Sequence, residues 1–256
     1  MSLLLEISGL SQRFGGLQAL TDFSFQLEEH ELVGLIGPNG AGKTTVFNIV
    51  SGFYKPTEGN IIFDGRPING LRPHQITALG IARTFQNIRL WHNMTVLDNL
   101  RLARSAKLGY SFWGAVLRTR RYWKEERAIE DRAREVLEMM NLTDCAEKLP
   151  KNLPYGLQRR VELARALTTD PRLLLLDEPA AGLNSADADD LIRFIRWIHD
   201  KFKLSIWLIE HQMKVVMSLC QHLTVIDFGC VIASGTPEEV RNHPGVIKAY
   251  LGDETL

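Results

Sequence analysis

A glycine-rich segment near the N-terminus has the composition of a phosphate-binding loop. It lies between the apolar run Leu32–Ile36 and the helix-compatible stretch Val46–Val50, and it consists of Gly37, Pro38, Asn39, Gly40, Ala41, Gly42, Lys43, Thr44 and Thr45. A strand that turns through glycines into a helix directs backbone N–H groups and the positive end of the helix dipole at one point, which suits a phosphate. The spacing fits G-x-x-x-x-G-K-[ST], in which the lysine binds the outer phosphates and the next hydroxyl binds Mg²⁺. A plain glycine-rich turn with a surface lysine is the alternative, and the flanking strand and helix disfavour it.

Two adjacent carboxylates, Asp177 and Glu178, follow the apolar run Leu173–Leu176. An apolar run without alternation is typical of a parallel strand covered on both faces, and ligands bind at the carboxyl ends of such strands. We therefore expect Asp177 to hold Mg²⁺ and its water, and Glu178 to polarise an attacking water, since phosphoryl transfer depends mostly on orientation and charge stabilisation. The alternative is an acidic turn after a core strand.

The elements that would position these residues alternate between strands and helices. Periodicity predicts strands at 3–9, 23–27, 60–65, 173–176, 205–209 and 223–227, and helices at 186–201 and 212–219. A loop at Arg13–Leu17 carries the aromatic Phe14. The early strands suggest an antiparallel edge sheet that leads into an α/β core.

A helical region interrupts this pattern from Val96 to about Leu142. Its helical face is marked by Ile129, Ala133, Val136, Leu137 and Met140, with a charged opposite face that indicates solvent exposure. We interpret it as a helical subdomain inserted in the core. At the C-terminus a turn at 235–237, a short helix at 238–242 and an end at 250–252 are expected.

Composition narrows the class of protein. The 256 residues contain 30 Lys and Arg against 30 Asp and Glu, so a general affinity for nucleic acid is not indicated. The three cysteines lack C-x-x-C spacing, which indicates neither a disulfide framework nor a zinc site. The N-terminus does not read as a signal peptide, and no run of about 18 apolar residues suggests a membrane span. A membrane role would have to run through a partner.

The segment LPYGLQRRVELARAL, from Leu153 to Leu167, resembles the signature of ABC-type ATPases, L-S-G-G-Q followed by a helix ending A-R-A-L. Other positions of that family's pattern occur in order across essentially the whole chain: Phe14, Gln86 in Thr84-Phe85-Gln86, Gly182-Leu183-Asn184, and His211. Taken singly, Phe14 reads as a core aromatic, Gln86 as a solvated loop residue and His211 as a helix cap. Their order and spacing favour the family roles.

The resemblance implies an α/β P-loop ABC ATPase fold with an antiparallel β edge subdomain, a RecA-like parallel-sheet core and an inserted helical subdomain. Residues 1–256 would form a single domain, with 1–95 and 168–256 as edge sheet and core and about 96–167 as the helical subdomain that includes the signature. ATP and Mg²⁺ are the implied ligands. Two such subunits would pair head to tail, so that each ATP lies between one P-loop and the signature of the other chain.

The same resemblance assigns residue roles. Phe14 would stack on adenine, and Glu178 and His211 would orient the water and the γ-phosphate. The expected catalytic residues are Glu178, His211, Lys43 and Gln86. The expected Mg²⁺ ligands are Thr44, Gln86 and Asp177. The expected nucleotide contacts are Phe14, residues 37–45 and Gly156.

The signature departs from the family pattern, because Pro154, Tyr155 and Leu157 replace its serine, first glycine and glutamine. Proline has neither a hydroxyl nor an N–H, so the usual serine contact with the γ-phosphate is lost. The backbone around Gly156 and the helix N-terminus remain as an anion site. We expect weaker nucleotide-driven closure there. Asn184, where aspartate is common, is a milder change.

Several details resemble the ATP-binding subunit of branched-chain amino acid importers, namely 14–16, 52–57, 82–86, 155–156, 177–184 and the tail 235–252. That branch implies a second ATPase subunit in a homo- or heterodimer, two transmembrane permeases, an extracytoplasmic substrate-binding protein and no nucleic acid. The chain would lie on the cytoplasmic face of the inner membrane, held by the permeases. The transported substrate and the type of dimer stay open.

Two segments allow a second interpretation. Residues 110–124 join aromatics to basic side chains, as in a patch near a bilayer or a permease, although an insertion whose aromatics pack internally is favoured. Residues 88–92 offer either a permease-docking groove or ordinary core packing. Among function classes, a lipid or lipopolysaccharide exporter ATPase, a soluble ABC protein acting on DNA or translation, and a P-loop kinase are the alternatives to an importer subunit.

Overall fold

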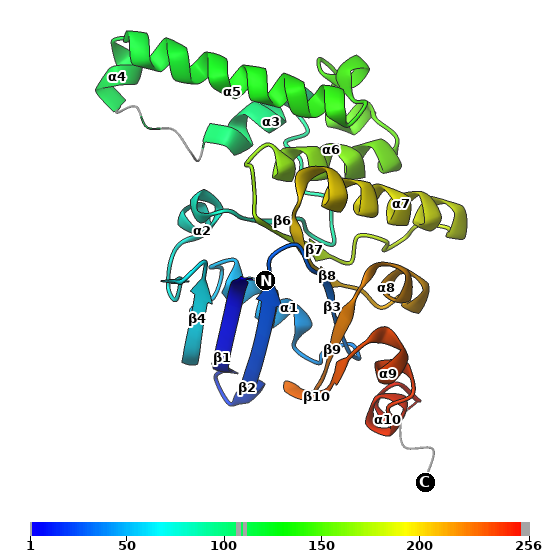
Figure 1. The fold of residues 1–256 in the computed structure, drawn as a ribbon. Coiled ribbons are helices and arrows are strands. Elements are labelled where there is room, and N and C mark those ends of the chain that lie inside the picture. The colour runs from blue at the N-terminus through cyan, green and yellow to red at the C-terminus, as the bar shows by residue number, and fades with distance from the viewer. Residues whose placement is uncertain (1, 106–108, 110–111, 252–256) are drawn as a thin grey trace.

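Two sheets form the centre of the protein, and helices cover them (Figure 1). The computed structural model describes residues 2–105, 109 and 112–251. The first sheet is antiparallel with the strand order β2-β1-β4-β5. Its strands are β1 (Leu3–Phe14), β2 (Leu17–Glu28), β4 (Glu58–Phe63) and β5 (Arg66–Pro67). The expected antiparallel edge sheet is thus confirmed.

The second sheet has the strand order β10-β9-β3-β8-β7-β6 and is parallel except at β10, which pairs antiparallel with β9. Its strands are β3 (Leu32–Ile36), β6 (Ile81–Arg83), β7 (Leu173–Asp177), β8 (Ser205–Ile209), β9 (His222–Asp227) and β10 (Cys230–Gly235). The parallel core predicted from the apolar runs is therefore present.

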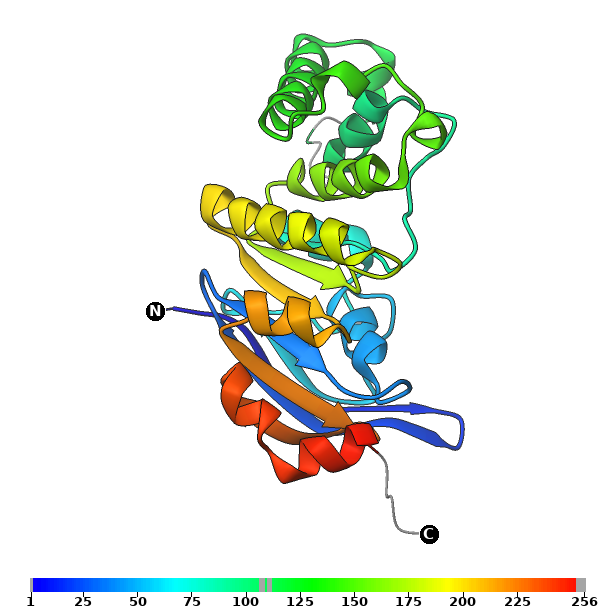
Figure 2. The ribbon, with the colours of Figure 1, turned by 90° about the vertical axis from the view of Figure 1, so that its right-hand side faces the viewer.

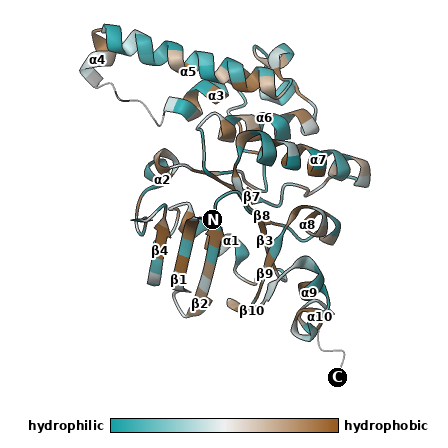
Figure 3. Cartoon of the chain, viewed as in Figure 1, coloured by the Kyte–Doolittle hydropathy of each residue, from teal (hydrophilic) through white to brown (hydrophobic). Residues whose placement is uncertain are grey.

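Both faces of the parallel sheet are buried, as its unalternating apolar strands predict. On β7, Leu174 and Leu176 pack into a cluster shared with the helices of one face, whereas Leu173 and Leu175 pack toward the antiparallel sheet and α1 (Lys43–Val50). Trp207 on β8 joins the two layers by stacking on Phe25 of β2, with 4.1 Å between ring centroids. Figure 3 shows the hydrophobic colour concentrated in the sheets and the hydrophilic colour over much of the outer helices.

The inserted helices gather at the end of the molecule away from the antiparallel sheet, as Figures 1 and 2 both show. They are α3 (Val96–Arg104), α4 (Phe112–Val116), α5 (Arg120–Met139) and α6 (Tyr155–Leu167). The expected stripe of α5 is buried. The exact division at residues 96 and 167 stays a prediction.

The remaining helices are α2 (Pro73–Leu79), α7 (Ser185–Phe202), α8 (Met213–Leu219), α9 (Pro237–Arg241) and α10 (Pro244–Leu251). Asn184 caps α7, because its side-chain oxygen accepts from the Asp187 N–H at 2.9 Å. Among the described residues, no helix combines the length and apolar character needed to cross a membrane.

Some boundaries were wrong in the sequence analysis. The strand expected at 3–9 continues to Phe14, because bulges between Ile7 and Gln12 break the alternation while the pairing with β2 resumes. The expected loop at 13–17 is instead a tight hairpin turn at Gly15-Gly16, where Gly15 has a φ of 58°. The short strands β6 and β10 and the helix α10 were missed. Of the expected chain end, Gly252 lies outside the described residues.

A buried arginine ties three elements together beneath the parallel sheet's carboxyl edge. From β6, Arg83 donates to Asp177 Oδ2 at 2.8 Å, to Asn48 Oδ1 at 2.8 Å and to Ser51 Oγ at 2.9 Å. Its guanidinium also lies 4.8 Å from the ring centroid of Phe85. Burial lowers the pKa of Arg83, whereas its hydrogen bond to Asp177 opposes that shift. The end of β7 is thereby fixed to the end of α1.

Replacing Arg83 by methionine would leave the buried Asp177 carboxylate without its guanidinium partner. We expect the free energy of unfolding to fall by about 3–5 kcal/mol, the range for removing one partner of a buried ion pair. Urea denaturation followed by circular dichroism measures the difference. Arg193→Met is the matched control, since Arg193 and its partner Asp190 are both 71% exposed and surface pairs contribute about 1 kcal/mol or less. Equal losses in the two variants would contradict the role given to Arg83.

Candidate active site

The P-loop connects β3 to α1 and is pressed between neighbouring backbones. Gly42, the N-cap of α1, has a φ of 106°, and a Cβ there would lie 2.8 Å from the carbonyl oxygen of Ala19 on β2. A Cβ at Gly37 would lie 2.0 Å from the carbonyl oxygen of Ile226 on β9. Glycine is therefore required at both positions. No side chain caps α1, so the first N–H groups of the helix are left for an anion.

Lys43 lies folded over the loop that precedes it. Its ammonium donates to the carbonyl oxygens of Gly37 at 2.7 Å and Pro38 at 2.8 Å. Burial lowers the pKa of Lys43, whereas the carboxylates of Glu178 and Asp177 raise it. The lysine and the two carboxylates predicted from separate motifs are therefore electrostatic neighbours.

The two carboxylates occupy different environments at the end of β7. Asp177 is buried, and one of its oxygens accepts from Arg83. Glu178 leaves the strand with a φ of 47°, an uncommon conformation for a residue with a side chain. Its N–H donates to the Ile209 carbonyl at 2.9 Å, which holds the residue against the end of β8. The turn thus separates the two side chains although they are adjacent in sequence.

The side chains of Gln86 and His211, both predicted to be catalytic, meet at the predicted catalytic carboxylate of Glu178. Gln86 Nε2 donates to Glu178 Oε2 at 2.7 Å, and His211 Nδ1 lies 3.6 Å from the same oxygen. Gln86 comes from the segment after β6 and His211 from the segment after β8, so three strand ends supply the group. The His211 side chain is half exposed, which leaves it open to a ligand.

Glu210 is a functional residue that the sequence analysis missed. Its fully buried carboxylate accepts from the N–H groups of Ala180 at 2.7 Å, His211 at 3.0 Å and Gln212 at 3.3 Å. Gln212 Nε2 in turn donates to the Ala180 carbonyl at 2.9 Å. The carboxylate therefore holds the backbone of His211 against the turn that follows Glu178. The available signal was an acidic residue at the end of an apolar strand.

The aromatic expected to stack on adenine lies at the hairpin between β1 and β2. Phe14 is 42% exposed and contacts Tyr54 edge to face, with 5.2 Å between ring centroids. Its exposure excludes the alternative of a core aromatic. Because Ala19 of the same hairpin approaches Gly42, the ring belongs to an element that touches the P-loop.

Oxygen atoms of the types that Mg²⁺ prefers are available near the P-loop. Asp177 supplies a carboxylate, Gln86 an amide oxygen and Thr44 an exposed hydroxyl at the first turn of α1. One carboxylate and two uncharged oxygen donors, completed by phosphate oxygens and water, suit Mg²⁺ better than a softer metal. The residues present therefore fit the expected ion.

The signature segment lies apart from the P-loop. Pro154 is the N-cap of α6 and makes no side-chain capping bond. Gly156 borders a cavity of about 1000 Å³ with Tyr155, Gly182 and Trp197, and Figures 1 and 2 both show α6 separated from α1. Apart from its two chain neighbours and the backbone of its own helix, no described atom lies within 4 Å of a Cβ placed at Gly156. Nothing within the described chain therefore requires a glycine at this position.

A second missed contact reaches the P-loop from the C-terminus. Burial raises the pKa of Tyr250 on α10, and a hydrogen bond from the backbone of Gly37 partly offsets that effect. The C-terminal helix therefore reaches the first residue of the P-loop. No local sequence pattern links these residues, which are far apart along the chain.

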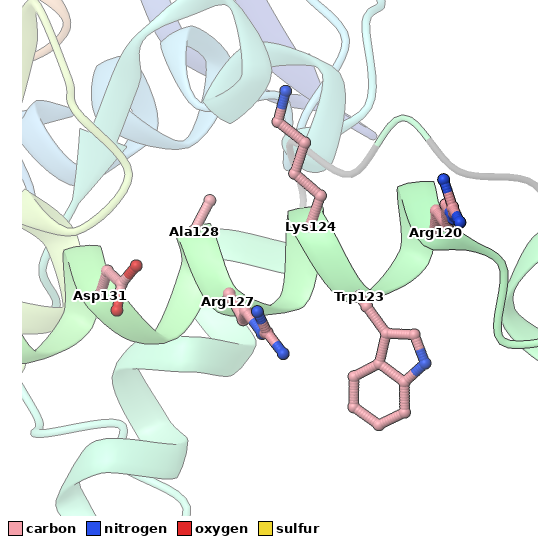
Figure 4. A pocket seen from close by; sticks show the side chains of 6 residues that line it. All are labelled: Arg120, Trp123, Lys124, Arg127, Ala128 and Asp131. Carbon is pink, nitrogen blue, oxygen red and sulfur yellow. The ribbon is translucent and has the colours of Figure 1, made fainter.

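The favoured interpretation of residues 110–124, internal packing of the aromatics, was wrong for two tryptophans. Trp113 is 69% exposed and Trp123 is 47% exposed. Both are exposed because α4 and the start of α5 extend beyond the helices against which the rest of α5 packs. Tyr110 and Ser111 lie outside the described residues. Figure 4 shows Arg120, Trp123 and Arg127 among the side chains that line a pocket on α5; this pocket is separate from the P-loop.

Residues 88–92 divide between the two interpretations. Leu90 is buried in the core, as ordinary packing requires, and the partly buried Ile88 packs against the same core cluster. Trp91 is 45% exposed and lies under the guanidinium of Arg165, 5.3 Å from the ring centroid. A permease-docking role for the segment stays a prediction.

Comparisons with known protein families agree with this geometry. The family model "ABC transporter" matches residues 20–181, and the model "Branched-chain amino acid ATP-binding cassette transporter" matches residues 230–255. A solved ATP-binding cassette of an ABC transporter in its ADP conformation superposes with a TM-score of 0.84 at 30% identity, covering 99% of this chain and 100% of that one. The predicted P-loop ABC ATPase fold is confirmed.

Curated relatives are similar over nearly the whole chain. The high-affinity branched-chain amino acid transport ATP-binding protein BraF of Pseudomonas aeruginosa is 48% identical over 250 residues, covering 98% of each chain. The corresponding protein LivG of Escherichia coli is 44% identical with the same coverage. With 46% identity and equal coverage, LivG of Salmonella typhimurium lies between them. The chain therefore belongs to the ABC transporter family, among its ATP-binding subunits.

Proposed function

We propose that the chain is the ATP-hydrolysing subunit of an importer for branched-chain amino acids. The observation that carries the hydrolytic activity is the convergence of Lys43, Gln86, Glu178 and His211 at one edge of the parallel sheet. Similarity to BraF and LivG over 98% of the chain supports the substrate class. The family model matched at residues 230–255 supports the same branch.

The site residues divide the reaction between them. The P-loop N–H groups and Lys43 bind the β- and γ-phosphates, and Phe14 stacks on adenine. Glu178 accepts a proton from the attacking water, whose oxygen bonds to the γ-phosphorus as the bond to the bridging oxygen of ADP breaks. His211 hydrogen-bonds the γ-phosphate, and Gln86 orients Glu178. Thr44, Gln86 and Asp177 would hold Mg²⁺, which would supply positive charge to the phosphate oxygens.

The separation of P-loop and signature supports a head-to-tail dimer. Within one chain, α6 lies apart from α1 (Figure 2), so Gly156 would contact the nucleotide held by a second ATPase subunit. That subunit is an identical or related chain. The domain division at residues 96 and 167 belongs to the same proposal, because the helical part carries the signature.

The remaining partners are those an importer needs. Two transmembrane permeases would hold the chain at the cytoplasmic face of the membrane, and an extracytoplasmic binding protein would deliver the substrate. Purification of the tagged chain from its native membranes in mild detergent tests this assignment. We expect two multi-span permeases, a second ATPase and a soluble binding protein to co-purify. Recovery of ribosomal or DNA-bound partners without a membrane protein would overturn it.

Replacing Glu178 by glutamine keeps the shape of the side chain and removes its basicity. We expect ATP turnover to fall by roughly 10²–10⁴-fold, the usual contribution of a general base, while nucleotide affinity is retained. Phosphate release and titration with a fluorescent ATP analogue measure the two quantities. Glu130→Gln, in an exposed pair on α5, is the control and should hydrolyse ATP at the unaltered rate. Unchanged turnover in Glu178→Gln would remove Glu178 from this role.

Replacing Pro154 by serine restores a hydroxyl at the N-cap of α6. We expect the ATP-dependent dimer to tighten by about 10- to 150-fold, since a hydrogen bond to a charged group contributes about 1.5–3 kcal/mol. Sedimentation equilibrium in a Glu178→Gln background, which preserves the ATP, measures the dimer dissociation constant. Pro237→Ser, at the first turn of α9, controls for the change of residue type. A dissociation constant that does not move would count against the signature assignment.

A further inference from the structure

The signature helix α6 holds the backbone around Gln86 through buried charged side chains. Arg159 donates to the carbonyl oxygen of Phe85 at 2.8 Å and to that of Gln86 at 2.6 Å. Glu162 accepts from the Arg89 N–H at 3.2 Å and pairs with Arg159 at 2.9 Å. Arg165, one helical turn further on, donates to the Arg89 carbonyl. Three side chains spaced three residues apart on α6 therefore bind one loop segment, residues 85–89.

This grip lies in the interior of the protein. Arg159 is 4% exposed and Glu162 is fully buried. A buried ion pair contributes little to stability compared with apolar residues of the same volume, because both charges lose their hydration. The planar guanidinium instead offers two parallel donors in a fixed geometry, and here they bind the carbonyl groups of two consecutive residues. This arrangement suits the positioning of the loop backbone better than it suits stabilisation of the fold.

The loop that α6 grips reaches the catalytic carboxylate. Arg159 holds the Gln86 carbonyl, and the Gln86 side chain donates to Glu178 at 2.7 Å. Two consecutive hydrogen bonds thus connect the middle of α6 to Glu178, the residue proposed to activate water. Neither Arg159 nor Glu162 has a hydrogen bond to Glu178 or Lys43 among the described residues, so any effect on chemistry must pass through the loop.

We propose that Arg159 and Glu162 are positioning residues that set the placement of Gln86 against Glu178, and thereby couple the signature helix to ATP hydrolysis in the same chain. The proposal rests on the hydrolytic function proposed above. When α6 shifts, the two carbonyls held by Arg159 shift with it, and the Gln86 amide moves relative to Glu178. A displacement of about 1 Å at such a contact can lower a rate by about 100-fold.

The test removes the ion pair from α6 as a unit. Arg159→Met combined with Glu162→Leu removes both charges of the pair, and Arg165, whose charge Glu162 also favours, keeps its hydrogen bond to the Arg89 carbonyl, so folding is expected to survive. The matched control is Arg134→Met combined with Glu130→Leu, which removes an Arg–Glu pair from α5 where both residues are exposed or half-buried. Steady-state hydrolysis gives kcat, and titration with a fluorescent ATP analogue gives nucleotide affinity. Circular dichroism verifies the fold of each variant.

We expect the α6 variant to lose about 100-fold in kcat while nucleotide affinity stays at the wild-type value, and the α5 control to change neither. The decisive comparison repeats the α6 substitutions in a Gln86→Ala chain. Because Arg159 acts through the Gln86 side chain, they should then change kcat by no more than about twofold, the scatter expected of independent sites. The same fold-loss in both backgrounds would overturn the proposal.

Two other outcomes separate this proposal from the function beneath it. If the wild-type chain hydrolyses ATP and the α6 variant matches it, Arg159 and Glu162 do not position Gln86, and the proposal fails alone. If the folded wild-type chain, assayed with its partner subunits, hydrolyses no ATP, the proposed function fails first. The more conservative Arg159→Lys retains the charge without the planar fork; we expect an intermediate kcat, and a full wild-type rate would count against the two-carbonyl contact.

Discussion

The parallel pairing of β3, β7 and β8 is the constraint on which the site depends. In the register of these strands, Ile209 on β8 is level with both Leu35 on β3 and Asp177 on β7. The three carboxyl ends therefore coincide, and whatever follows each strand must meet its neighbours. The P-loop follows β3, Glu178 follows β7 and His211 follows β8. No loop needs to travel far, so a rigid sheet determines the geometry of the chemistry.

Bringing these groups to one edge of the parallel sheet also places charged side chains close together in the interior. Asp177 and Glu210 are carboxylates with almost no solvent contact, which is unfavourable unless hydrogen bonds replace the lost water. Arg83 meets that need for Asp177, and three backbone N–H groups meet it for Glu210. These partners come from β6 and from the segments that follow β7 and β8. The polar contacts that replace the lost water therefore also fix the ends of α1, β6, β7 and β8 relative to one another.

The sequence predicted most of what local patterns control. The phosphate loop and the parallel strands β3, β7, β8 and β9 follow from spacing or from unalternating apolar runs, whereas Gln86 and His211 were assigned to the site through the resemblance to ABC-type ATPases. Arg83, Glu210 and Tyr250 escaped prediction because each acts through partners distant in sequence, which only tertiary packing brings near. The exposure of Trp113 was not predicted because an aromatic residue favours burial on average. In the structure, α4 extends beyond the helices that would cover this side chain.

Pro154, where the signature departs from the family pattern, is the N-cap of the helix that carries Arg159, and in the proposed dimer the two residues would act on different nucleotides. In the proposed head-to-tail dimer the N-terminus of α6 would bind the nucleotide of the second subunit, whereas the middle of α6 contacts its own Gln86. A rigid helix transmits any shift at one of these points to the other, because its backbone hydrogen bonds resist bending. Binding of a second subunit's nucleotide at Gly156 would therefore be felt at Glu178 of the same chain. In that dimer, loss of the family's serine contact would weaken the first of these connections and leave the second intact, so Glu178 would stay responsive although the signature binds the partner's nucleotide less tightly.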